Sequence, residues 1–113
     1  MEHAMGLYEA PFNSIKSGRK TVEVRLYDEK RRKLGLGDII RFTKLPDSKE
    51  TVTVEVIELN KYPTFKELYE SIPARDFDAV GSSIDERVER IHHIYTPKEE
   101  EKWGTLAIAI KLC

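Results

Sequence analysis

Residues 18–27 have the sequence GRKTVEVRLY, in which polar and apolar side chains alternate from Lys20 onward. Alternation with a period of two is typical of a β-strand that has two different faces. The predicted strand Lys20–Tyr27 carries Val22, Val24 and Leu26 on one face and Thr21, Glu23, Arg25 and Tyr27 on the other. The sequence therefore predicts a strand that packs one face on a core and presents charged side chains on the opposite face.

Around this strand, the sequence predicts strands and helices in separate runs. A short helix with Pro11 at its N1 position precedes the strand and ends at Gly18. Strands at 39–43 and 51–59 follow, then helices with N-caps at Thr64, Ser83 and Thr96, and a closing strand at 105–112. Segregated runs favour an α+β fold in which mostly antiparallel strands form a small β-barrel, with two to four short helices packed around it.

Length and composition indicate one domain over residues 1–113, with 40% apolar and 35% charged residues. We expect a cytoplasmic protein without a membrane partner, because no apolar run approaches the roughly 20 residues of a membrane span. Cys113 is the only cysteine, and the histidines have no acidic or cysteine neighbours at ligand spacing. We therefore expect no metal site and no cofactor; the sequence does not indicate an oligomeric state.

The net charge of -1 combines a basic first part with an acidic second part. Residues 1–45 contain ten Lys/Arg and six Asp/Glu, and residues 46–113 contain nine and fourteen, so the balances are +4 and -5. Eight of the basic residues lie between Lys16 and Lys33. A local cationic zone on a nearly neutral protein favours a specific anionic partner, although such a run also occurs on ordinary solvated faces.

Glu23 and Arg25 are separated by one residue, so their side chains lie next to each other on one face of the predicted strand. Two interpretations are open. The pair is a surface ion pair that contributes about 0–1 kcal/mol, or it lines a cleft in which the carboxylate orients the guanidinium toward a phosphate or a base edge.

The segment from Gly18 to Arg25 fits the pattern G-x-K-x-x-E-x-R and resembles the ASCH domain family of the PUA-like superfamily, especially its small prokaryotic single-domain members. Similarity continues through Gly37-Asp38, Phe65-x-x-Leu68 and Gly104–Ile110. The resemblance implies a PUA-like β-barrel with a neighbouring cleft and an association with RNA recognition. It also implies that Lys20, Glu23 and Arg25 line the cleft.

On this basis we expect a module that binds RNA or a nucleotide-like small molecule. Lys20 and Arg25 would contact phosphates or base edges, and Glu23 would orient Arg25 or accept a hydrogen bond from a base amino group. The expected ligand-binding residues are Lys20, Thr21, Glu23, Arg25, Tyr27, Lys30, Arg31 and Arg32, with Tyr27 as a stacking candidate and the last three as a track for the RNA backbone.

An enzyme is the second hypothesis. One branch of the family resembles an amidohydrolase that acts on N4-acetylcytidine with a Lys, a Thr nucleophile three residues later and a downstream Glu. Lys20 matches that Lys, but Glu23 occupies the Thr position and has no hydroxyl nucleophile. Lys20 and Glu23 would instead form a general acid–base pair acting on a modified nucleoside or on RNA. They converge only if Lys20 precedes the strand or lies at a bulge.

A protein-interaction adaptor is the third hypothesis. The acidic, helical second part of the chain would then be the contact surface.

Overall fold

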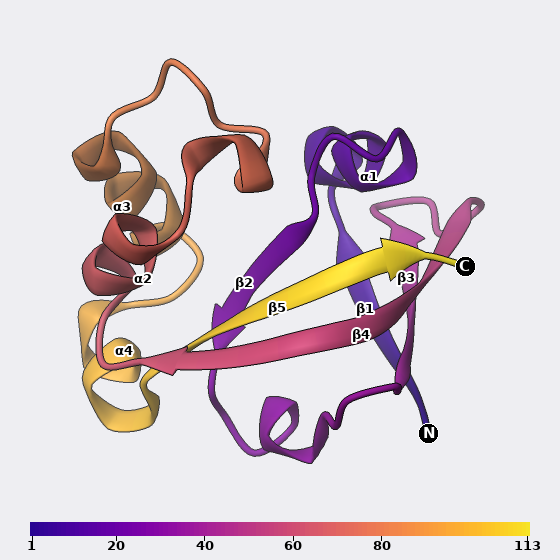
Figure 1. Ribbon diagram of the computed structural model, residues 1–113, viewed down its shortest axis with the longest axis horizontal. Helices are drawn as coiled ribbons and strands as arrows, with labels where there is room; N and C mark the ends of the chain where they lie inside the picture. The colour runs from indigo at the N-terminus through magenta and orange to yellow at the C-terminus, as the bar shows by residue number, and fades with distance from the viewer.

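The computed structural model describes residues 1–113 and contains one curled five-stranded sheet with four α-helices beside it (Figure 1). The strands are β1 (Glu2–Leu7), β2 (Val22–Leu26), β3 (Ile39–Lys44), β4 (Thr51–Tyr62) and β5 (Thr105–Leu112). The helices are α1 (Glu9–Lys16), α2 (Phe65–Ser71), α3 (Ile84–His92) and α4 (Pro97–Trp103), with short 3-10 turns η1 (Arg31–Lys33) and η2 (Ala74–Phe77). No helix has both the length and the apolar character needed to cross a bilayer.

The strand order is β1-β3-β4-β5-β2, and only the β1–β3 pair is parallel. The sheet curls into a half-barrel whose edges are β1 and β2. Helix α1 covers one end of it, whereas α2, α3 and α4 gather on one side (Figure 1). The predicted α+β class, the mostly antiparallel barrel-like sheet and its short helices are confirmed.

The prediction that the chain begins with a helix is wrong, because strand β1 precedes α1. In β1, only Met5 and Leu7 are buried, so its alternation is too short to stand out in the sequence. The strand is defined by its pairing: β1 lies parallel to β3, with Met5 opposite Phe42. Long-range pairing rather than local pattern therefore defines this strand.

Helix boundaries follow the predicted caps in the second half of the chain. Ser83 and Thr96 each form a complete capping box, and Thr64 accepts a hydrogen bond from the Glu67 N–H. Pro11 is not at N1, because α1 begins two residues earlier, at Glu9.

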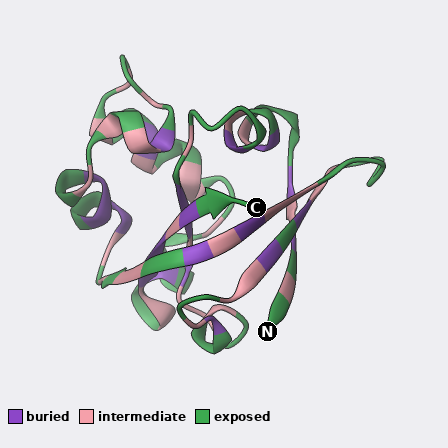
Figure 2. Cartoon of the chain, turned by 45° about the vertical axis from the view of Figure 1, so that its right-hand side comes forward, coloured by how far each residue is buried: buried purple, intermediate pink, exposed green.

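Two apolar cores lie on opposite faces of the sheet. The first fills the half-barrel and includes Phe12, Phe42 and Ile108. The second lies between the sheet and the helices and includes Val22, Val24, Leu26, Phe65, Leu68 and Phe77. Figure 2 shows buried residues along the strands and exposed residues along the loop between β3 and β4. The apolar face of β2 lies in the helical core, and Glu23 on its polar face is only 4% exposed, so that face does not look outward into bulk water.

Helix α4 is anchored by a buried carboxylate. One oxygen of Glu100 accepts a 2.6 Å hydrogen bond from the Phe65 N–H at the start of α2. The other oxygen lies 2.8 Å from His92 Nε2 at the end of α3. Glu100 is only 9% exposed, and its two oxygens connect α4 to both α2 and α3.

We expect Glu100→Ala to lower the free energy of unfolding by about 1–3 kcal/mol, because it leaves the buried Phe65 N–H without an acceptor. Urea denaturation measures this loss. The control is Glu101→Ala in the same helix, at an exposed residue without a hydrogen bond, which should change stability by less than about 0.5 kcal/mol. Equal effects of the two substitutions would contradict the anchoring role.

Candidate functional site: a cleft between the half-barrel and helix α3

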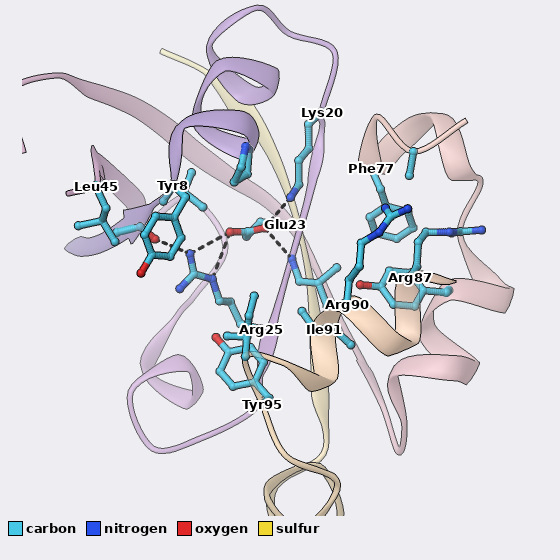
Figure 3. Close-up of a pocket in the computed structure, with 17 residues that line it drawn as sticks. Tyr8, Lys20, Glu23, Arg25, Leu45, Phe77, Arg87, Arg90, Ile91 and Tyr95 are labelled. Carbon is cyan, nitrogen blue, oxygen red and sulfur yellow. Dashed lines mark hydrogen bonds and ion pairs between the residues drawn. The ribbon is translucent and has the colours of Figure 1, made fainter. Parts of the chain in front are cut away.

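A cleft of about 400 Å³ opens between the half-barrel and α3. One wall comes from the junction of β1 and α1 and from β2, and the facing wall comes from α3 and the segment after it (Figure 3). Its polar lining consists of Lys20, Glu23, Arg25, Arg87, Arg90 and three tyrosines, Tyr8, Tyr69 and Tyr95. The structure thus places Lys20, Glu23 and Arg25 side by side in a concave site.

Lys20 reaches Glu23 because it lies before the strand begins. The chain turns at Gly18, whose φ of +81° is accessible to glycine at low cost, and β2 starts only at Val22. Lys20 is therefore free of the strand's alternation, and its Nζ lies 2.9 Å from Glu23 Oε1. Lys20 and Glu23 converge because Lys20 precedes the strand, which is one of the two arrangements predicted from the sequence to bring them together.

The Glu23 carboxylate accepts four hydrogen bonds, so both of its oxygens are fully used. Oε1 accepts from Lys20 Nζ at 2.9 Å and from the Val24 N–H at 3.1 Å. Oε2 accepts from Arg25 Nη2 at 2.9 Å and from Arg25 Nε at 3.2 Å. A carboxylate with this set of partners fixes the positions of its neighbours (Figure 3).

Burial and charge act on Glu23 in opposite directions. Burial alone would raise the pKa of its carboxyl, but the charges of Lys20 and Arg25 and their hydrogen bonds lower that pKa to about 2. Glu23 is therefore ionised at neutral pH. General bases work best with a pKa near the operating pH, so this carboxylate is a weak proton acceptor.

Arg25 links the two edges of the half-barrel. Besides its two bonds to Glu23, Nη2 donates to the Gly6 carbonyl of β1 at 3.0 Å. Although burial disfavours the charge, Glu23 raises the pKa of Arg25, and so does the neighbouring Tyr95 hydroxyl. The bonds to Glu23 and Gly6 do not use the second terminal nitrogen, Nη1, which leaves it to the Tyr95 hydroxyl or to a guest in the cleft.

Sequence reasoning missed the facing wall. Arg87 and Arg90 are three residues apart on α3 and therefore share a face of the helix with Ile91. The i, i+3 spacing of two arginines on the helix predicted after Ser83 was the available signal. Tyr69 of α2 and the largely exposed Tyr8 complete the lining.

The remaining predicted ligand-binding residues do not line this cleft. Lys30 Nζ donates to the Ala4 carbonyl at 2.8 Å, and Arg31 pairs with Asp28 at 2.8 Å. Arg32 lies 4.4 Å from the centre of the Tyr27 ring and also bonds the Tyr27 carbonyl. Thr21 lines a separate hollow between β2, β4 and η2.

Comparison with known proteins identifies a family and shows which solved structures share the fold. The model of the ASCH domain matches residues 5–113. The crystal structure of the hypothetical protein PH0355 is 37% identical, has a TM-score of 0.89 and matches over 100% of both chains. Protein PF0455 from Pyrococcus furiosus is 35% identical with a TM-score of 0.79, over 99% of this chain and 97% of that one.

A more distant structure, the ASCH domain from Lactobacillus crispatus, is 16% identical with a TM-score of 0.69 and shares the fold over 98% of this chain and 79% of its own. No curated protein matches the sequence.

We expect Glu23→Gln to lower the free energy of unfolding at pH 7 by about 3–5 kcal/mol, because it leaves two buried cations without a counter-charge. The pKa of Glu23 falls from an ordinary 4.5 to about 2 in the folded state. Its contribution, about 3 kcal/mol, is present above pH 4.5 and is lost as the pH falls toward 2. Denaturation at several pH values measures both effects.

The variant should lack this acid-dependent loss. Glu70→Gln, at an exposed glutamate without a hydrogen bond, is the matched control and should follow the wild type. If Glu23→Gln loses stability between pH 4.5 and 2 as steeply as the wild type, Glu23 does not have the depressed pKa.

Proposed function

The chain belongs to the ASCH domain family, and on that premise we propose that its cleft binds RNA or a nucleotide-like ligand. The observation that carries the proposal is the charge of the lining: four cationic side chains stand against one carboxylate, which gives a balance of +3. That carboxylate already accepts four hydrogen bonds. The free polar groups of the cleft are therefore mostly donors, which suit an anionic ligand rich in acceptors.

Size and shape support the same class of ligand. The volume of about 400 Å³ lies within the range of small-molecule sites, roughly 300–1,000 Å³. Aromatic side chains stand on both walls, since Tyr8 lies beside the half-barrel and Tyr95 follows α3 (Figure 3). Unpaired bases are commonly held by stacking on such rings.

The motif residues have different roles in this proposal. Lys20 Nζ and Arg25 Nη1 donate to base carbonyl or phosphate oxygens. Glu23 orients both donors, and its saturated oxygens leave no position for a base amino group. Thr21, Tyr27, Lys30, Arg31 and Arg32 lie outside the cleft and would contact only the flanking backbone of a longer RNA.

The state of Glu23 favours binding over hydrolysis. A general acid–base pair needs a carboxylate that takes up a proton near neutral pH, whereas the pKa of Glu23 is lowered to about 2. The carboxylate therefore acts on the ligand indirectly, through the two cations that it positions.

Lys20→Gln tests the proposal, because it removes a donor while the Glu23–Arg25 pair is retained. We expect the Kd for a short single-stranded RNA to rise about tenfold, the equivalent of one charge-assisted hydrogen bond. Fluorescence anisotropy measures binding, and Lys49→Gln, at an exposed lysine outside the cleft, is the matched control. With roughly three phosphate contacts, the slope of log K against log salt should be about -2.

Equal affinities of Lys20→Gln and Lys49→Gln would contradict the role of Lys20, and a wild type that binds neither RNA nor a nucleotide would contradict the proposal. The same proteins should be incubated with N4-acetylcytidine. Turnover by the wild type that is lost in both Lys20→Gln and Glu23→Gln would favour the hydrolase hypothesis instead.

A further inference from the structure

The two cations on the α3 wall differ from those on the β2 wall in forming no ion pair, although the charge of Arg90 acts on Glu86 one turn earlier in α3. Lys20 and Arg25 share the Glu23 carboxylate, so the three together carry a charge of +1. Arg87 and Arg90 form no ion pair, although both line the cleft. The uncompensated charge of the cleft therefore lies on its helical wall.

Arg87 is the more constrained of the two. It is 9% exposed, and its Nη1 is buried without a hydrogen-bond partner. Its Nε has only a long, 3.4 Å hydrogen bond to the Ser83 carbonyl, and the guanidinium lies 5.2 Å from the centre of the Tyr69 ring. A buried guanidinium with unused donors is unfavourable unless an anion approaches it.

Neighbouring groups add further donors. Arg90 is exposed and lies three residues from Arg87, so the two side chains project from the same side of α3. The hydroxyl of Tyr69 makes no hydrogen bond within the protein, and burial, together with the charge of Glu23, raises the pKa of Tyr69 to about 12. It is therefore a neutral donor at neutral pH.

Building on the proposed function, we propose that Arg87 and Arg90 form a separate anion subsite that holds the phosphate of a nucleotide, while the base lies against Lys20 and Arg25. Guanidinium groups suit this role because their planar forks bind phosphate oxygens in pairs. Charge is the reason for this assignment. The anionic phosphate is placed at the α3 wall because its two cations form no ion pair. The neutral base carbonyl oxygens are placed at the β2 wall because Glu23 largely neutralises the cations there.

Calorimetric titration with uridine 5′-monophosphate and with uridine tests this division, since the two probes differ only in the phosphate. We expect the wild type to bind the monophosphate about tenfold or more tightly than the nucleoside. Arg90→Gln should reduce this preference to about threefold or less. Arg75→Gln, at an 81% exposed arginine outside the cleft, is the matched control and should retain the wild-type preference.

Arg87→Lys provides a second variant, because it keeps the charge but removes the planar fork. Thermal melting checks that it folds, and inorganic pyrophosphate is the probe: we expect it to raise the Tm of the wild type and of Arg75→Gln, but to raise that of Arg87→Lys and Arg90→Gln markedly less. If Arg87→Lys does not fold, Arg90→Gln alone decides the comparison.

The outcomes separate this subsite from the proposed function. Equal affinity of the wild type for the monophosphate and the nucleoside would overturn the subsite and leave nucleotide-like binding intact. A preference that survives in Arg90→Gln would also overturn it. RNA binding without any mononucleotide binding would overturn the subsite only, whereas a wild type that binds neither RNA nor either probe would overturn both proposals.

Discussion

The buried Glu23 carboxylate is the charge on which the arrangement of this protein depends. It holds Lys20, which comes from a loop, and Arg25, which comes from a strand, because each of them bonds one of its two oxygens. Through Arg25 it also reaches the Gly6 carbonyl of β1. Two cations in a poorly solvated cleft would otherwise repel each other at a high energetic cost. One carboxylate thus organises the β2 wall of the cleft and connects the two edges of the half-barrel.

Glu23 and the two cations therefore have different roles: the carboxylate positions side chains, and Lys20 and Arg25 present hydrogen-bond donors to the cleft. Since every lone pair of Glu23 is occupied, the carboxylate presents no acceptor to the cleft. The cations it fixes still have donors that Glu23 does not use, including Arg25 Nη1. Preorganised donors bind acceptors with less loss of side-chain entropy than mobile ones. The ion pair is therefore better understood as a rigid donor surface than as a proton-transfer device.

The sequence predicted features that depend on neighbouring residues and missed features that depend on contacts between distant parts of the chain. Alternation along β2 and the capping residues are local signals, and they predicted the fold class. The spacing of Glu23 and Arg25 left a surface ion pair and a cleft pair both open, and only the resemblance to the ASCH family pointed to a cleft. Strand β1 depends on pairing with β3, which lies more than 30 residues away along the chain. The direction of each basic side chain is also a tertiary property: Lys30, for example, bonds the Ala4 carbonyl instead of entering the cleft. Arg87 joins the site only because α3 packs across from β2.

The same alternation that builds the sheet also sets the width of the cleft. Val22 and Val24 point from β2 into the helical core, where they meet Phe65 and Phe77. Glu23, on the intervening position, points to the cleft on the opposite face. The packing of these apolar side chains therefore determines how far α3 stands from β2, and with it the separation of the two cationic walls. Because packed cores resist compression, a change of volume at Val22 or Phe65, which do not line the cleft, would move the α3 wall relative to the motif.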